Sequence, residues 1–124
     1  MRNTIQEQPA LLSFKSFVFG IISIIKSPTF LILSLIGNLS ICLISIVFYY
    51  VEVLENPKIV TYMDALWWGF ATATTTGYGD ITPVTITGKI ISIILMLTGL
   101  ALFGMFTALF AEVVLIRPKK SSEP

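Results

Sequence analysis

Two long apolar stretches, separated by a shorter and more polar region, dominate the pattern of the chain. Residues 29–51 contain no charged side chain, and residues 84–116 contain only Lys89 and Glu112. A helix needs about 20 apolar residues to cross a bilayer core about 30 Å thick. We therefore predict an outer transmembrane helix over 29–51 and an inner transmembrane helix over 84–116.

A shorter apolar block, residues 10–27, precedes the first of these helices and contains Lys15 and Lys26. Small residues recur in it at steps of three and four, which places them on one face of a helix; they are Ser13, Ser16, Gly20, Ser23 and Ser27. This pattern predicts an amphipathic helix in the membrane interface within an N-terminal region 1–28. A short third spanning helix, with the small residues as its packing face, is the alternative.

The polar region between the long stretches divides into three parts. Residues 52–62 contain the acidic pair Glu52 and Glu55 followed by Asn-Pro, which predicts an exposed loop. Residues 63–74 form a helix-length block too short to cross a bilayer, and its early acid, Asp64, suits the positive end of a helix dipole. Residues 75–80 follow as non-helical chain.

Composition supports a membrane protein and excludes several kinds of catalytic chemistry. The chain has 124 residues, 55% of them hydrophobic and 12% charged, whereas a soluble domain carries about 25% charged residues. It has no His and one Cys, so it cannot assemble a Cys–His nucleophile pair, a metal cluster or a disulfide framework. A chain this short can form a pore only as an oligomer.

The distribution of Lys and Arg predicts the orientation of the chain. Lys58 lies between the long stretches and Lys89 lies near the start of the second one. The other basic residues flank the two ends; they are Arg2, Lys15, Lys26, Arg117, Lys119 and Lys120. Because basic residues favour the cytoplasmic side, we expect a multi-pass plasma-membrane protein with both termini, including the tail 117–124, in the cytoplasm.

The segment "TTTGYGD", residues 74–80, places glycines and hydroxyls between two oily helices. Backbone that is neither helix nor sheet cannot face lipid, so this segment must line a cavity. Gly77 and Gly79 flank Tyr78, and glycine readily adopts left-handed conformations. Alternating handedness turns successive carbonyls to one side and makes a ladder of oxygen dipoles. The negative end of the preceding short helix favours a cation there.

The same segment resembles the Thr-x-Gly-Tyr-Gly selectivity filter of potassium channels, and residues 65–80 resemble the pore helix and filter of small bacterial two-transmembrane channels. The resemblance covers residues 29–116. It implies an all-α membrane fold of two transmembrane helices around a re-entrant pore helix and filter loop. It also implies a four-fold symmetric homotetramer with one filter on its axis, in addition to the N-terminal interfacial helix.

The resemblance assigns roles to individual residues. The K⁺ ligands are the carbonyls of Thr75, Thr76, Gly77 and Tyr78 together with the Thr75 hydroxyl, and Gly79 supplies backbone freedom at the mouth. The rings of Trp67, Trp68 and Tyr78 resemble an aromatic cuff around the filter, and Asp80 marks the outer mouth. In the inner helix, the positions of hinge or close-packing glycines correspond to Gly99 and Gly104.

Small residues at helical spacing also mark one face of the inner helix; they are Gly104, Thr107, Ala108 and Ala111. We expect this face to line a cavity, although tight helix packing is the alternative. Glu112 is the acid deepest in this helix, and four copies could concentrate K⁺ at the inner mouth. In the alternative, Glu112 lies outside the membrane core and pairs with Arg117 or Lys119.

One position departs from some bacterial relatives. Where those have a pore-helix Glu that pairs behind the filter with the acid after Gly-Tyr-Gly, this chain has Ala71. Asp80 then relies on the indole N–H of Trp67. This difference leads to the hypothesis that the filter inactivates weakly, which sustained single-channel currents would support.

These observations predict a passive K⁺-selective channel that is not an enzyme. Its expected partners are three identical subunits, membrane lipids, K⁺ and pore blockers such as Ba²⁺, with no nucleic acid and no cofactor besides K⁺ in the filter. The alternatives are a less selective cation channel of the same fold, a pore subunit of a K⁺ uptake system, and a membrane-disrupting or anchoring peptide.

Overall fold

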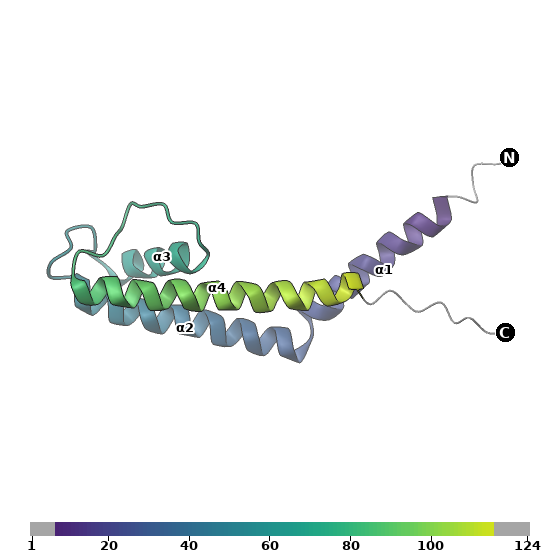
Figure 1. Cartoon of the computed structure of the whole chain (residues 1–124), viewed down its shortest axis with the longest axis horizontal. Coiled ribbons are helices and arrows are strands. Elements are labelled where there is room, and N and C mark those ends of the chain that lie inside the picture. The colour runs from purple at the N-terminus through teal and green to yellow at the C-terminus, as the bar shows by residue number, and fades with distance from the viewer. Residues whose placement is uncertain (1–6, 116–124) are drawn as a thin grey trace. The chain divides into compact units, whose positions relative to one another are not determined.

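The computed structural model describes the backbone of residues 7–115 and the side chains of residues 14–112. Within these residues the chain is helical and contains no strand (Figure 1). The helices are α1 (Glu7–Ile25), α2 (Pro28–Glu52), α3 (Tyr62–Ala73) and α4 (Ile86–Leu115). The chain forms two compact units, one spanning Ile32–Met105 and the other comprising Met1–Leu31 with Phe106–Pro124.

Two helices are long and apolar enough to cross a membrane, Pro28–Glu52 and Ile86–Glu112. In the most apolar 18-residue stretch of each helix, only 17% is buried within the chain for Pro28–Glu52 and 11% for Ile86–Glu112. A core helix of a soluble protein would bury most of its surface, whereas these helices expose Leu35, Leu39 and Ile86. Their composition and exposure together indicate helices whose surroundings are lipid or other apolar surfaces.

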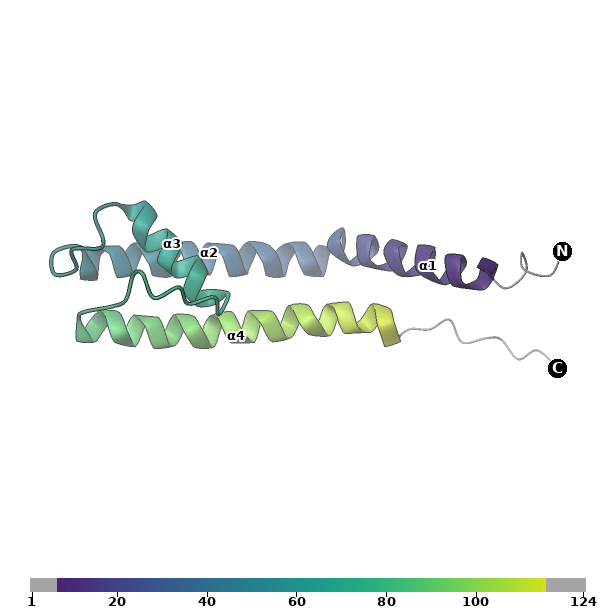
Figure 2. The same cartoon turned by 90° about the horizontal axis from the view of Figure 1, so that it is seen from above.

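In the unit 32–105, α2 and α4 run side by side in opposite directions, and α3 lies against both (Figure 2). Small residues permit these close contacts. A Cβ placed on Gly37 of α2 would lie 3.1 Å from the methyl carbons of Leu102 in α4. A Cβ placed on Gly69 of α3 would lie 3.5 Å from Ile41 of α2.

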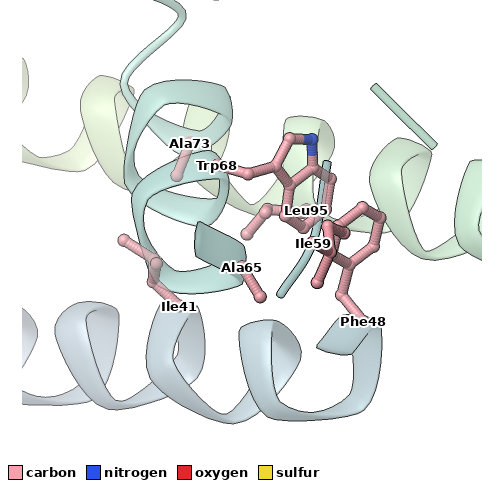
Figure 3. Packing of buried hydrophobic residues seen from close by; sticks show 7 residues of the cluster. All are labelled: Ile41, Phe48, Ile59, Ala65, Trp68, Ala73 and Leu95. Carbon is pink, nitrogen blue, oxygen red and sulfur yellow. The ribbon is translucent and has the colours of Figure 1, made fainter. Parts of the chain in front are cut away.

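The core of this unit lies where the three helices meet (Figure 3). It is made of Ile41 and Phe48 from α2, Ala65, Trp68 and Ala73 from α3, Leu95 from α4, and Ile59 from the connecting loop. The rings of Phe48 and Trp68 stack with centroids 3.4 Å apart and planes 8° from parallel. This core therefore fastens the short helix to both long ones.

The start of α3 is held by its own first turn. Thr61 is the N-cap, and Asp64 accepts hydrogen bonds from the backbone N–H groups of Thr61 at 2.7 Å and Val60 at 3.0 Å. The bonds from Thr61 and Val60 lower the pKa of Asp64. The expectation of an acid in the first turn of this helix is confirmed, and the carboxylate fixes where the loop ends.

Most helix ends lie one to three residues from those expected. The helix predicted over 63–74 spans Tyr62–Ala73, and that predicted over 29–51 spans Pro28–Glu52. The inner helix was expected from residue 84 but begins at Ile86, because Thr85 caps its N-terminus: the Thr85 hydroxyl accepts a 2.8 Å hydrogen bond from the Gly88 N–H. Residue 116 lies outside the described residues.

Close approach of α4 to the end of α3 depends on Gly99. A Cβ there would lie 2.7 Å from the Cα of Ala73, which real Cβ atoms do not tolerate. The other glycine singled out in this helix, Gly104, has no neighbour within 4 Å of such a Cβ. The sequence predicted a hinge or a close-packing role for these two glycines. Within one chain, Gly99 packs closely against its neighbour and Gly104 does not.

We predict that Gly99→Ala lowers the midpoint of thermal unfolding of the detergent-solubilised protein, measured by circular dichroism, because overpacking costs about 1–3 kcal/mol. Gly104→Ala is the matched control. Its added methyl meets open space within the chain, and alanine favours a helix over glycine by about 1 kcal/mol. Equal midpoints for the two variants would contradict the packing role of Gly99.

Candidate functional site

The candidate site is the non-helical segment that follows α3. Every residue from Thr74 to Asp80 is exposed within the single chain. The segment returns to α3 through backbone hydrogen bonds, from Thr75 N to Thr72 O at 3.1 Å and from Gly77 N to Ala71 O at 3.0 Å. The last turn of the helix therefore positions the start of the segment.

Backbone handedness alternates along this segment. The φ angles of Thr75, Gly77 and Gly79 are +60°, +56° and +77°, and the intervening residues, Thr76 and Tyr78, do not have positive φ. The expectation that the glycines permit left-handed conformations is confirmed. Left-handed backbone at Thr75 was not anticipated, since a β-branched residue rarely adopts it. Such strain costs about 1–3 kcal/mol and is concentrated at functional sites.

Hydroxyl groups connect the segment to α3 at its inner end. The Thr74 hydroxyl donates to the carbonyl of Phe70 at 2.7 Å, so its single proton is used there. The Thr76 hydroxyl lies 2.9 Å from the Thr74 hydroxyl and must then be the donor of that bond. Side chains as well as backbone therefore tie residues 74–77 to the pore-helix end.

The outer end is held by Trp67 and Asp80. The indole N–H of Trp67 donates to Oδ2 of Asp80 at 2.9 Å, as expected for a chain with Ala71 in the pore helix. The ring of Trp67 also stacks on Tyr78, with centroids 5.2 Å apart and planes 11° from parallel. The Trp67 N–H, the backbone N–H groups of Ile81 and Asp80 itself, and the charge of Lys58 lower the pKa of Asp80.

Trp68 lies elsewhere. The resemblance grouped it with Trp67 and Tyr78, but within the chain its ring is 4% exposed and stacks on Phe48 in the core. Successive helix residues point about 100° apart, so within one chain Trp67 stacks on Tyr78 while Trp68 points into the core. Within one chain, Trp67 contacts Tyr78 and Asp80, and Trp68 anchors the helix that carries Trp67.

The inner-helix candidates form an exposed face of α4. Gly104 belongs to one unit, while Thr107, Ala108 and Ala111 belong to the other, and all are exposed in the single chain. Glu112 is exposed as well and lines a groove of about 400 Å³ with the small residues Ser16, Gly20, Ser23 and Ser27. Its alternative partners, Arg117 and Lys119, lie outside the described residues.

Glu52, the last residue of α2, lies against the chain just before α4, whereas the sequence pattern predicted an exposed loop for it. That placement is wrong: Glu52 is fully buried. One carboxylate oxygen accepts hydrogen bonds from Asn56 Nδ2 at 2.9 Å and Val84 N at 2.8 Å. The other accepts from Thr85 N at 2.9 Å and from the Thr85 hydroxyl at 2.6 Å. All of the carboxylate's acceptor sites are thus filled.

We call Glu52, Asn56 and Thr85 the outer clamp. The second N–H of the Asn56 amide donates to the carbonyl of Thr82 at 2.9 Å, so the clamp also holds the chain just after the filter segment. A Cβ on Gly88 would lie 2.8 Å from Cδ of Glu52, which explains a glycine in the first turn of α4. The spacing of Glu52 and Asn56, four residues apart, was the only available sign of this contact.

Two apolar helices run in opposite directions, and between them lie a short helix and a loop whose backbone alternates in handedness. This arrangement is that of the pore unit of an ion channel. Residues 37–115 match the family model described as "Ion channel", which is more than half of the chain. The chain therefore belongs to the ion channel family.

Solved structures support the same fold. A voltage-gated K⁺ channel pore module, crystallised in a closed state in lipid membranes, superposes with a TM-score of 0.54 at 42% identity. The match covers 63% of this chain and 86% of that one. The all-α fold predicted from the sequence is confirmed.

Longer relatives match over the same region. The voltage-gated potassium channel of Aeropyrum pernix is 42% identical over 73 residues, covering 56% of this chain and 25% of the relative. The calcium-gated potassium channel TvoK of Thermoplasma volcanium is 37% identical over 54 residues, covering 44% and 16%. The chain thus matches at most a quarter of the length of these relatives.

We predict that Trp67→Phe raises the pKa of Asp80 toward the ordinary carboxyl value of about 3.9, because an aromatic ring is kept at this position but the N–H donor is lost. In the wild type, the stabilisation is complete above that ordinary value and is lost as pH falls through the lowered folded pKa. Carbon-13 NMR titration of the Asp80 carboxyl in detergent measures the shift. Trp68→Phe is the control and should leave this pKa unchanged; an unchanged value in Trp67→Phe would disprove the assignment.

Proposed function

We propose that this chain is the pore of a K⁺-selective channel that conducts K⁺ passively across the cell membrane. The observation that carries the proposal is the alternation of positive φ at Thr75, Gly77 and Gly79 within a Thr-Thr-Gly-Tyr-Gly segment. Family membership and the likeness to K⁺ channel pore modules support it.

The chemistry of the segment suits a dehydrated monovalent cation. Alternating handedness directs successive carbonyls to one side, so the carbonyls of Thr75, Thr76, Gly77 and Tyr78 would be the ligands, with the Thr75 hydroxyl as a further oxygen. Gly79 supplies the last left-handed turn. Rings of such oxygens replace the hydration shell of K⁺, and the C-terminal end of α3 adds about half a negative charge.

A complete ring requires other copies of the chain. The filter residues are exposed in one chain, with Tyr78 64% exposed, and irregular backbone of this kind cannot face lipid. The apolar side chains of α4, among them Ile90, Ile93 and Leu97, are exposed as well. Three identical subunits around a four-fold axis would cover both, which makes the functional unit a homotetramer.

The membrane arrangement follows from the charges. Both termini would lie in the cytoplasm and the segment 52–83 outside, so that Asp80 meets ions at the outer mouth. Gly104, Thr107, Ala108 and Ala111 would line the inner cavity, and Glu112 would lie near its cytoplasmic mouth. The proposal requires no cofactor and no catalytic residue, since conduction makes and breaks no covalent bond.

A less selective cation channel of the same fold and a pore subunit of a K⁺ uptake system are the competing functions. Reconstitution of the purified protein in liposomes distinguishes them. We expect K⁺ efflux that greatly exceeds Na⁺ efflux, a reversal potential that follows the K⁺ gradient, and block by external Ba²⁺. Equal K⁺ and Na⁺ permeability would refute selectivity, and absence of flux would refute the channel.

The left-handed backbone at Gly77 provides a direct test of the filter. Gly77→Ala forces an L residue into a conformation that costs it about 1–2 kcal/mol, and we expect K⁺ flux in liposomes to fall by at least about tenfold. A semisynthetic chain with D-alanine at position 77 is the matched control. It adds a methyl group of the same size, favours positive φ and should conduct. Crowding does not explain a defect of the L-alanine variant, because nothing in the chain lies within 4 Å of its Cβ. Normal flux through the L-alanine variant would contradict the assignment.

A further inference from the structure

We propose that a groove at the ends of the two apolar spans binds the primary ammonium group of an ethanolamine lipid, with Glu112 as its counter-ion. The groove lies within one compact unit of the chain, Met1–Leu31 with Phe106–Pro124. It shares no residue with the candidate filter, and lipid binding can be measured without ion flux. The inference therefore goes beyond the proposed channel function and does not depend on it.

The depth of the groove in the membrane follows from the spans that end there. Its volume is about 400 Å³, and its lining includes Thr29 at the start of the span Pro28–Glu52 and Glu112 at the end of the span Ile86–Glu112. Spans of this length end at the boundary between hydrocarbon and headgroups. The groove is therefore placed at the level of the lipid headgroups, which are the ligands that reach it in any membrane.

One negative charge lies in this groove. Glu112 is exposed, and neither of the nearest described lysines, Lys15 and Lys26, lines the groove or pairs with it. A carboxylate at the membrane boundary without a counter-ion is costly, so we expect a cation there. The same charge repels phosphate, which makes anionic headgroups poor ligands. A divalent cation needs more ligands, and the described part of the chain holds no group of three acidic, His or Cys side chains.

The oxygens near Glu112 fit a group with several N–H donors. The hydroxyls of Ser23, Ser27 and Thr29 line the same groove. The Ser27 hydroxyl accepts a 3.2 Å hydrogen bond from the Phe30 N–H and keeps a second lone pair. An ammonium group has three donors for such acceptors. A trimethylated nitrogen carries the same charge but has no N–H to donate, so the groove should prefer ethanolamine to choline.

The surroundings of the groove suit the rest of a zwitterionic lipid. Ile24 and Leu109 line it with apolar side chains, against which the methylene groups next to the nitrogen would pack. Lys26 does not line the groove, but it is exposed and precedes Ser27 in the sequence. Its ammonium group would meet the lipid phosphate, so an acid and a base match both charges of one headgroup.

A series of lipids with identical acyl chains tests the preference. Its members run from phosphatidylethanolamine through the singly and doubly N-methylated lipids to phosphatidylcholine, so the N–H donors decrease while the charge stays constant. Native mass spectrometry of the full chain in detergent measures the lipid bound in pairwise competition. We expect phosphatidylethanolamine to bind at least about tenfold more tightly than phosphatidylcholine, with the methylated lipids between them.

Two variants separate the charge from the shape of the groove. Glu112→Gln removes the charge with little change in size and should bind phosphatidylethanolamine at least about tenfold more weakly. Ser23→Leu keeps the charge but fills the groove, and it should weaken binding as well; it decides the matter if Glu112→Gln does not assemble. Glu55→Gln is the matched control, because it makes the same substitution on an exposed acid outside the groove. Its lipid preference should equal that of the wild type.

Several results would overturn the proposal. Equal affinities along the lipid series would do so, as would unchanged binding in both Glu112→Gln and Ser23→Leu. Free ethanolamine that competes with the lipid at equal concentration would overturn the lipid as the source of the ammonium group. A preference that appears only after Arg117→Gln and Lys119→Gln would assign the groove to those basic side chains instead. A wild-type protein without K⁺ flux refutes the proposed channel and leaves this site untouched, since binding alone decides it.

Discussion

Peptide groups that leave the helix after Ala73 lose the internal hydrogen bonds that make a helix compatible with lipid. Three of their N–H groups regain partners, since Thr74, Thr75 and Gly77 donate to the carbonyls of Phe70, Thr72 and Ala71. Residues 74–80 nevertheless remain exposed in the single chain. Polar backbone of this kind cannot face lipid, so in the proposed channel other copies of the chain cover it and K⁺ meets its carbonyls. The short α3, its N-terminal cap and its packed core all position this one segment.

Anchors at both ends of the segment offset its strain. At the inner end, hydroxyls of Thr74 and Thr76 tie the segment to the helix. At the outer end, Trp67 bonds Asp80, and the outer clamp holds the following chain. These contacts come from the pore helix on one side and from α2 on the other. The segment is therefore shaped by the elements around it as much as by its own glycines.

Much of the fold was predictable because membrane spans depend on length and apolarity, which are properties of sequence alone. The short helix was predictable from Asp64 and its limited length. Glu52 was misplaced because acids near Asn-Pro are usually exposed. Its actual burial depends on donors at Val84 and Thr85, more than 30 residues away. Within one chain Trp68 points into the core, because adjacent residues of a helix point in different directions, and its place in an aromatic cuff stays a prediction.

The sequence by itself determined two membrane spans, a short helix between them and a loop whose glycines permit left-handed backbone. The two spans follow from the length of the apolar stretches. The loop follows from its glycines, which readily adopt left-handed backbone. Only the tertiary structure decided that Trp67, rather than Trp68, stacks on Tyr78 of the same chain, that Thr75 is left-handed, and that Glu52 is buried. The reason is physical: a charge can be buried only where several donors converge, and convergence of distant residues is a property of packing.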